Sequence, residues 1–171
     1  MKLKYSIALG LPLASASAMG ADLALKLELP QLNVAEYHRP YLAAWLENSE
    51  QKVVTTLSVL YDTRKKDNGG AKWAKDLRQW WRKAGREVEL PLDGVSGATR
   101  APGEHTLTFP AARATLDKLP AGQYTLVVEA AREAGGREAV KVPLQWPPKT
   151  AQNVSAQGKE ELGAIVVQLK P

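Results

Sequence analysis

Short stretches of alternating apolar and polar residues constrain the fold of this chain more than any other feature of its sequence. A leucine stands at every second position of residues 23–29, and Tyr124, Leu126, Val128 and Ala130 repeat the same spacing later in the chain. A period of two residues is that of a β-strand with one buried and one exposed face. The chain is therefore expected to build β-sheets that cover a core on one side.

Other segments are predicted to be strands because they are rich in β-branched and aromatic residues and are bounded by turn residues. The predicted strands are residues 23–29, 41–47, 53–61, 105–109, 123–132, 138–146 and 163–169. Residues 41–61 read as one hairpin, and residues 123–146 read as a second, with Gly135 and Gly136 in its turn. Residues 85–104 are rich in Gly and Pro and are expected to be loop, as is the polar stretch after Pro148.

Residues 72–84 alone change to the period of a helix. Its apolar and aromatic residues fall on one face of the predicted helix: Trp73, Leu77, Trp80, Trp81 and Ala84. Gly85 is the expected C-cap. The tryptophans either pack into the core, as aromatic residues at this spacing usually do, or border a bound aromatic ring.

Many short strands with one helical segment predict an all-β fold. The expected architecture is an antiparallel β-sandwich of two sheets with one inserted Trp-rich helix. Residues 120–126 read Pro-Ala-Gly-Gln-Tyr-Thr-Leu and resemble a strand entry of immunoglobulin-like bacterial domains, so the sandwich is expected to be immunoglobulin-like. The chain has 171 residues, which is enough for one core, and residues 22–171 are predicted to form a single domain.

The first residues have the layout of an export signal. Lys2 and Lys4 precede the apolar run of residues 7–13, and small residues follow up to Ala21. Cleavage is expected after Ala21, with Ala18 as the alternative. The apolar run is too short to span a bilayer. Residues 1–21 are therefore a predicted signal peptide, and the mature protein is expected in the periplasm.

The chain contains no cysteine, which excludes disulfides, thiolate metal sites and Cys-linked haem. A redox role would therefore need a cofactor that is held without thiols. His38 and His105 are the only histidines, and no ligand spacing around them indicates a metal site. Both are expected to be structural, His38 in a loop and His105 at the start of a strand.

The formal net charge is +5, and the positive charge is concentrated in residues 64–86. This segment holds nine Lys or Arg residues and only two acidic ones, Asp67 and Asp76. No nucleic-acid-binding motif is present, so nucleic acid is not an expected partner. The segment is either a solvated helix face or a surface that steers an acidic partner or an anionic cofactor toward the protein.

Residues 93–99 read Asp-Gly-Val-Ser-Gly-Ala-Thr and are the main candidate for chemistry. A threonine hydroxyl is a weak nucleophile without an outside base, so Thr99 would react only inside another enzyme's active site. Such a target must be exposed and free of large side chains, so that it can enter that active site. Gly94 and Gly97 have no side chain, and Ala98 places only a methyl group beside the hydroxyl. The alternative is an ordinary Gly-rich turn.

This segment resembles the Asp-x-x-Ser/Thr-Gly-Ala-Thr motif on which ApbE-type FAD:protein FMN transferases esterify FMN. The resemblance implies covalent FMN, attached through a phosphoester to Thr99. Asp93 and Ser96 are expected to shape the loop and to serve recognition by the transferase, and Arg100 to stabilise the phosphodiester. The predicted cofactor-binding residues are Asp93, Gly94, Ser96, Gly97, Ala98, Thr99 and Arg100.

A wider resemblance rests on residues 41–48, 72–73 with 77–81, 93–100, and 122–126 with 129–133, which occur in that order. Together they resemble an uncharacterised family of predicted periplasmic proteins, a domain of unknown function linked to PepSY membrane proteins and ApbE-type transferases. The resemblance implies an electron carrier rather than an independent catalyst, with a flavin transferase and a PepSY-type membrane reductase as partners. Two alternatives stay open: a non-redox immunoglobulin-like interaction or assembly module, and a flavoenzyme with its own substrate.

Overall fold

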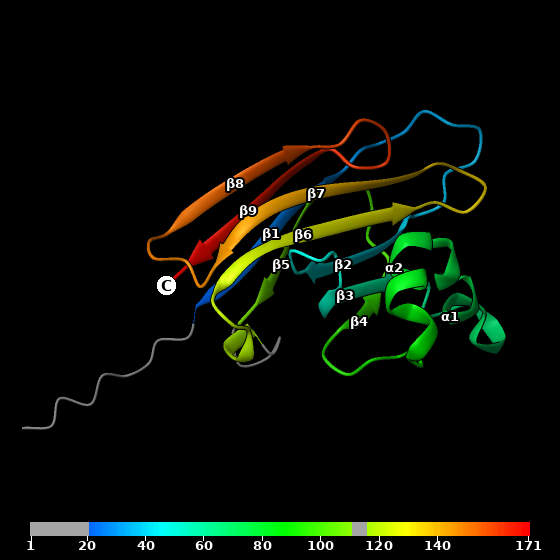
Figure 1. The fold of residues 1–171 in the computed structure, drawn as a ribbon. Coiled ribbons are helices and arrows are strands. Elements are labelled where there is room, and N and C mark those ends of the chain that lie inside the picture. Colours follow the sequence, from blue (N-terminus) through cyan, green and yellow to red (C-terminus); the bar gives the residue numbers. More distant parts are fainter. Residues whose placement is uncertain (1–20, 111–115) are drawn as a thin grey trace, which may run out of the picture.

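A computed structural model of the protein describes residues 21–110 and 116–171 and shows a sandwich of two β-sheets (Figure 1). The first sheet has the strand order β5-β1-β9-β8. Its strands are β1 (Asp22–Leu29), β5 (Gly103–Phe109), β8 (Gln152–Gln157) and β9 (Ala164–Lys170). All its pairings are antiparallel. The all-β sandwich predicted from the sequence is confirmed.

The second sheet has the strand order β4-β3-β2-β6-β7. Its strands are β2 (Tyr41–Glu47), β3 (Val53–Tyr61), β4 (Ser96–Ala98), β6 (Gly122–Ala131) and β7 (Arg137–Trp146). Both predicted hairpins are confirmed, β2 with β3 and β6 with β7. The short β4 runs parallel to β3, so the sandwich is not purely antiparallel.

The core between the sheets follows the alternation in the sequence. Leu23, Leu25, Leu27 and Leu29 of β1 are each nearly inaccessible and pack against the inward side chains of the second sheet, such as Leu126 of β6. Each fully buried leucine contributes about 1.5–3 kcal/mol relative to an exposed one. The period-two pattern therefore marks the main source of stability of the sandwich.

A second apolar layer covers the outer face of the second sheet, where residues 62–95 connect β3 to β4 (Figure 1). The helical pieces in this connection are η1 (Lys66–Asn68), α1 (Gly69–Trp73), η2 (Ala74–Asp76), α2 (Arg78–Lys83) and η3 (Gly85–Glu87). Their buried side chains, among them Leu77 and Trp80, pack on Trp45 and Val127 of the sheet. The inserted Trp-rich segment was expected at this place in the chain.

The predicted continuous helix over residues 72–84 is wrong in detail. Leu77 has φ −72° and ψ 71°, which is not helical and separates η2 from α2. Trp73, before this break, has 43% of its surface exposed, whereas Trp80, after it, is fully buried. Gly85 has no positive φ, and it does not act as a left-handed C-cap. A Cβ there would lie 2.7 Å from the Trp80 ring, so close packing requires this glycine.

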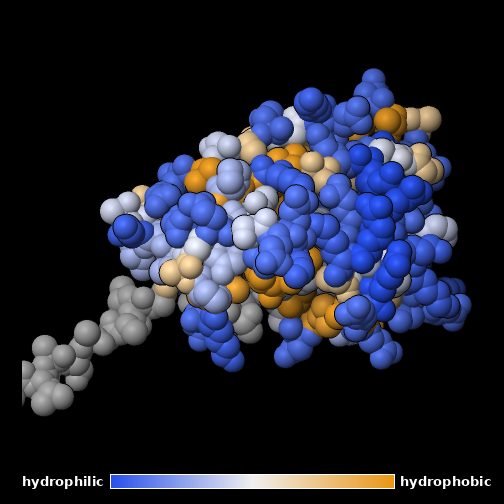
Figure 2. Space-filling view, viewed as in Figure 1, coloured by the Kyte–Doolittle hydropathy of each residue, from blue (hydrophilic) through white to orange (hydrophobic). Residues whose placement is uncertain are grey.

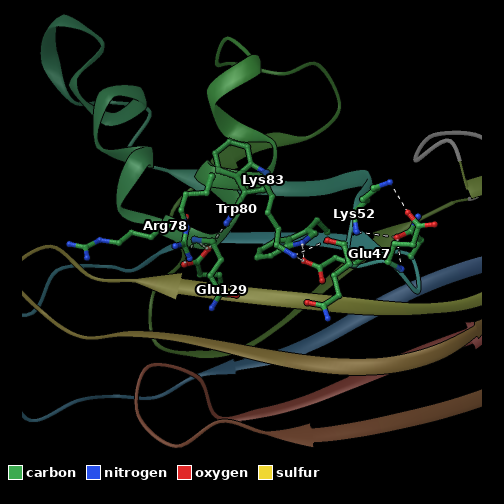
Figure 3. A network of polar contacts seen from close by, with 12 residues as sticks. Glu47, Lys52, Arg78, Trp80, Lys83 and Glu129 are labelled. Atoms are coloured by element: carbon green, nitrogen blue, oxygen red, sulfur yellow. Dashed lines mark hydrogen bonds and ion pairs between the residues drawn. The ribbon is translucent and has the colours of Figure 1, made fainter.

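Two buried carboxylates attach α2 to the sheet (Figure 3). Glu129 of β6 accepts hydrogen bonds from the backbone N–H groups of Gln79, at 3.0 and 3.1 Å, and of Trp80, at 2.9 Å. Glu47 of β2 accepts a hydrogen bond from Lys83 Nζ at 2.6 Å. Burial raises the pKa of Glu129, and the backbone N–H groups of Gln79 and Trp80 partly oppose that rise. Both ends of α2 are thus held by the sheet beneath it.

Two segments expected to be loop contain strands. β8 lies in the polar stretch after Pro148, and β4 lies in the Gly-rich stretch of the motif. A short η4 (Leu116–Lys118) precedes β6. None of the helices in the described part of the chain is long and apolar enough to cross a membrane. The predicted signal peptide, residues 1–21, lies outside the described residues except for Ala21.

Candidate functional site

The motif of residues 93–99 forms an edge of the second sheet. β4 pairs in parallel with the end of β3, with Gly97 opposite Leu60. Backbone hydrogen bonds hold it at both ends: Val59 N–H donates to the carbonyl of Val95 at 3.0 Å, and Thr99 N–H donates to the carbonyl of Tyr61 at 3.2 Å. Thr99 therefore stands immediately after a paired edge strand, half-buried, next to the exposed Ala98.

The turn before β4 is shaped by Ser96 and Gly94. Ser96 Oγ accepts a hydrogen bond from Leu92 N–H at 2.9 Å, which confirms that Ser96 shapes this loop. Gly94 has φ 68°, a left-handed conformation that strains other residues, and no other atom lies within 4 Å of a Cβ built on it. The side chain of Asp93 is exposed and forms no hydrogen bond with the described residues, so the role expected of Asp93 stays a prediction.

The motif separates two hollows. One, of about 470 Å³, lies between the β3–β4 edge and β5, and its motif residues are Asp93, Gly94, Val95, Ser96, Gly97 and Arg100. The other, of about 350 Å³, is called the Thr99 hollow below, and it is lined by Tyr37, His38, Arg39, Tyr41, Asp62, Thr63, Arg64, Ala98, Thr99 and Glu133. Arg100 and Thr99 thus line different hollows. The role of Arg100 beside a phosphodiester stays a prediction.

Two arginines, Arg39 and Arg64, are the cations of the Thr99 hollow, whose lining also holds Asp62 and Glu133. Arg39 and Arg64 are exposed, and neither forms an ion pair with another residue that the structure describes. The acidic residues of the lining are already engaged: Asp62 accepts a hydrogen bond from Arg64 N–H at 3.0 Å, and Glu133 pairs with Lys65 at 3.0 Å. The two guanidinium groups are therefore available to an anion, and guanidinium groups bind phosphate well.

Tyr41 brings an unsatisfied hydroxyl to the same hollow. The residue is buried, and its hydroxyl has no hydrogen-bond partner within the described ranges. Burial raises the pKa of Tyr41 to about 12. The Asp62 backbone N–H partly opposes this rise but does not meet hydrogen-bond geometry. Burial also raises the pKa of Tyr37. Both hydroxyls are neutral at neutral pH, and that of Tyr41 is almost inaccessible and has no hydrogen-bond partner among the described residues.

The sequence reasoning did not predict which other residues line the hollow beside Thr99. Tyr37, His38 and Arg39 belong to the connection from β1 to β2, and Arg64 follows β3, so chain distance hides their meeting with Thr99. His38 lies in a loop, as predicted, and is 3.3 Å from Glu36. His105 lies in β5, as predicted, with Nε2 2.7 Å from the carbonyl of Ala101. The described residues contain no cluster of three or more His, Cys, Asp or Glu suited to a metal.

Comparison with known proteins places the chain in a family. No curated protein and no solved structure matches it. Residues 22–164 match DUF2271, described as a predicted periplasmic protein. The match covers both sheets up to the start of β9, including the inserted Trp-rich segment and the motif. The chain therefore belongs to the DUF2271 family of predicted periplasmic proteins, in agreement with the periplasmic location expected from its sequence.

Proposed function

We propose that the protein is a periplasmic electron carrier with FMN attached covalently to Thr99. The observation that supports the proposal is the position of Thr99. It follows an edge strand that is paired on one side only, and it lines a hollow with two arginines and a tyrosine hydroxyl that have no side-chain partner among the described residues. A tethered anionic cofactor would find cations and a hydrogen-bond donor beside its attachment point.

The attachment itself is a phosphoryl transfer that a separate enzyme performs. Thr99 Oγ attacks the FMN phosphorus of FAD, an Oγ–P bond forms, and the pyrophosphate P–O bond breaks to release AMP. The hydroxyl proton goes to a base of the transferase, because no carboxylate or histidine in the described part of the chain forms a hydrogen bond to Thr99. An ApbE-type FAD:protein FMN transferase is the proposed partner for this step.

The residues of the Thr99 hollow fit the group. Arg39 and Arg64 would hold the phosphodiester, which keeps about one negative charge. The Tyr41 hydroxyl, which has no partner among the described residues, would donate to a polar edge of the ring system once a small shift of the lining exposes it, and the Tyr37 ring would offer an apolar face. A volume of about 350 Å³ lies within the range of small-molecule sites. When bound, FMN supplies one- or two-electron transfer, while the protein supplies tethering and local charge.

The proposal assigns the protein a carrier role rather than a reaction of its own. A PepSY-type membrane reductase is the proposed electron partner, as the family resemblance implies. Trp73 is the exposed tryptophan of the inserted segment, whereas Trp80 is buried between this segment and the sheet. Trp80 is therefore not available to border the flavin ring. Trp73 is flanked by the ammonium groups of Lys65 and Lys75, each 5.5 Å from its ring centroid.

Coexpression with a flavin transferase tests the attachment. The purified protein should gain the mass of one esterified FMN and keep flavin fluorescence after denaturation, whereas Thr99→Ala should gain neither. Thr63→Ala is the matched control, because Thr63 lines the same hollow and should leave labelling unchanged. An unlabelled wild-type protein, or equal labelling of Thr99→Ala, would contradict the proposal. Either result would favour a non-redox interaction module, the alternative prediction from the sequence.

The placement of the ring needs a second measurement on labelled protein. If the flavin lies in the Thr99 hollow, Tyr41→Phe and Arg64→Gln should shift its visible absorption or circular dichroism in the folded state. Urea should abolish the difference between these variants and the labelled wild type. Arg100→Gln tests the other hollow in the same way. A shift with Arg100→Gln alone would move the ring to the hollow beside β5.

A further inference from the structure

A basic groove lies on the outer face of the second sheet, beside α2. It has a volume of about 440 Å³ and is formed by α2, the segments on either side of it, and the start of β7. Its cations are Lys75, Arg78, Arg82, Arg86 and Arg137. Figure 2 shows that hydrophilic residues gather on the face of the molecule where β7 and α2 lie. None of this charge belongs to the Thr99 hollow, which has a separate lining.

The cations of the basic groove form few contacts within the fold: Arg82 Nε donates to the carbonyl of Arg78 at 3.2 Å, and Lys75 Nζ lies 5.5 Å from the Trp73 ring centroid. Among the residues that the structure describes, none of the five forms an ion pair. Arg78 extends away from the Glu129 carboxylate, although both line the groove (Figure 3). Arg78 and Arg82 stand four residues apart on α2, where like charges destabilise a helix by a few tenths of a kcal/mol. Stability alone does not explain this arrangement.

Among the described residues, the carboxylates in the groove form no ion pair with these cations, although Arg137 and Arg82 partly oppose the rise that burial causes in the pKa of Glu129. Glu129 is 1% exposed and points its oxygens at the backbone N–H groups of Gln79 and Trp80. Glu138 accepts four backbone hydrogen bonds, from residues 159–162, at 2.7 to 3.0 Å. Burial opposes ionisation of Glu138, but these N–H groups together lower its pKa, so its charge is matched by donors from the chain. The five outward cations face solvent.

The groove is also firmly supported. Glu129 holds the start of α2, and the Lys83–Glu47 pair, with a side chain of Glu47 that is 2% exposed, holds its end. Trp81 lines the groove and packs beside Trp80, with ring centroids 6.3 Å apart. A preformed groove loses little conformational entropy when a ligand binds. Trp81 adds an apolar surface among the guanidinium groups.

We infer that the basic groove binds an acidic segment of a partner protein. An arginine guanidinium group can bind a carboxylate through two hydrogen bonds. The five cations of the groove lie on several elements, and a single small anion would not contact all of them. A recess suits a protruding chain better than the flat surface of a membrane. Binding would rest on side chains, because Lys141 and Pro143 protect the free edge of β7 against strand addition. The inference does not depend on flavin.

Fluorescence anisotropy with a labelled peptide of alternating glutamate and leucine residues tests the inference. The unlabelled full-length protein should bind this probe at low ionic strength and release it as salt is added. The triple variant Arg78→Gln, Arg82→Gln, Arg137→Gln should bind about tenfold more weakly or worse. The matched control replaces the exposed Lys26, Lys118 and Lys149 by Gln, which changes net charge equally, and it should keep most of the affinity.

Each other outcome overturns the inference. Equal weakening in both triple variants would mean that the probe senses only net charge. Displacement of the peptide by stoichiometric pyrophosphate would identify a small-anion site, and tighter binding to vesicles of anionic phospholipid would identify a membrane surface. Thr99→Ala should bind the peptide like the wild type, so a failure of the flavin proposal and a failure of this inference are distinguishable. Near-ultraviolet circular dichroism verifies that the triple variants are folded.

Discussion

Glu129 joins the inserted segment to the sheet, and its replacement is the sharpest test of the fold around the basic groove. It lies on β6 with 1% of its surface exposed, and it accepts three hydrogen bonds from the N–H groups of Gln79 and Trp80 (Figure 3). Glu129→Ala removes the acceptor and leaves both backbone donors at the start of α2 without a partner. Glu129→Gln keeps one carbonyl oxygen in nearly the same place.

The expected loss in the free energy of unfolding follows from two backbone donors and one buried carboxylate. A hydrogen bond to a charged group contributes about 1.5–3 kcal/mol, so the two donors give about 3–6 kcal/mol before burial is counted. Burial of the carboxylate opposes this and raises its pKa. We expect a net loss of about 2–4 kcal/mol for Glu129→Ala and about 1–2 kcal/mol for Glu129→Gln.

The pH dependence has a definite sign. Because the folded-state pKa of Glu129 is raised above its ordinary value of 4.5, ionisation costs more in the folded than in the unfolded protein. Its contribution to stability is complete below that ordinary value and declines as pH rises through the raised pKa. The wild type should therefore exceed Glu129→Gln most at acidic pH, and the difference should shrink toward neutral pH.

Urea unfolding followed by tryptophan fluorescence measures both effects. Glu133→Gln is the control, because Glu133 is exposed and pairs with Lys65 at the surface, where such a pair contributes about 0–1 kcal/mol. The reasoning fails if Glu129→Ala costs less than the control. It also fails if the difference between wild type and Glu129→Gln grows toward neutral pH, because Glu129 would then have a lowered pKa.

Two further predictions concern buried polar groups. Arg132 and Glu161 form a bidentate pair with both contacts at 3.1 Å, and their side chains are only 8% and 4% exposed. In urea unfolding, Arg132→Met or Glu161→Met alone should lower the free energy of unfolding by about 3–5 kcal/mol. The double variant should lose less than the sum of the two single losses. Additive losses would contradict this coupling. Tyr41→Phe should leave the free energy of unfolding unchanged or raise it by about 1 kcal/mol, because the Tyr41 hydroxyl is buried without a partner; a clear loss of stability would show that the hydroxyl is satisfied.

Most of the sandwich could be predicted because its strands carry a local signal. Leu23 to Leu29 alternate with exposed positions, and β6 buries Tyr124, Leu126 and Val128 as its sequence indicates. A strand of this kind has one face on the core whatever its partner is, so its period identifies it without knowledge of the fold. The two hairpins follow from the turns between such strands.

The strands that were missed have no such pattern. β4 consists of Ser96, Gly97 and Ala98, which carry little apolar surface, and its pairing depends on the backbone of β3. β8 is polar, and only Val154 and Ala156 pack against the core. Their identity as strands comes from a partner that is distant in sequence. The break at Leu77 was missed for a related reason, since capping by Glu129 replaces helix continuity.

Only the motif half of the candidate site could be predicted from the sequence. Residues 93–99 stand together in sequence, so the motif could be singled out, but the arginines opposite Thr99 come from two other connections. Arg39 precedes β2 and Arg64 follows β3, and only the antiparallel pairing of β2 with β3 brings these two strand ends together. Sequence reasoning assigned the phosphate to Arg100 because it is the nearest cation along the chain. Our proposal favours Arg39 and Arg64 because they line the same hollow as Thr99, whereas Arg100 lines the other one.

The parallel pairing of β3 with β4 explains why the motif and the basic groove occur in one segment. Parallel neighbours require a long crossover, and residues 62–95 provide it across the outer face of the sheet. The crossover contains Arg78 and Arg82 in α2, and it leads into β4, after which Thr99 follows. Glu129 anchors α2 to the sheet, and α2 belongs to the connection that leads to β4. In the proposed carrier, a partner that docks on the groove would thus bind the same segment that holds the flavin attachment site.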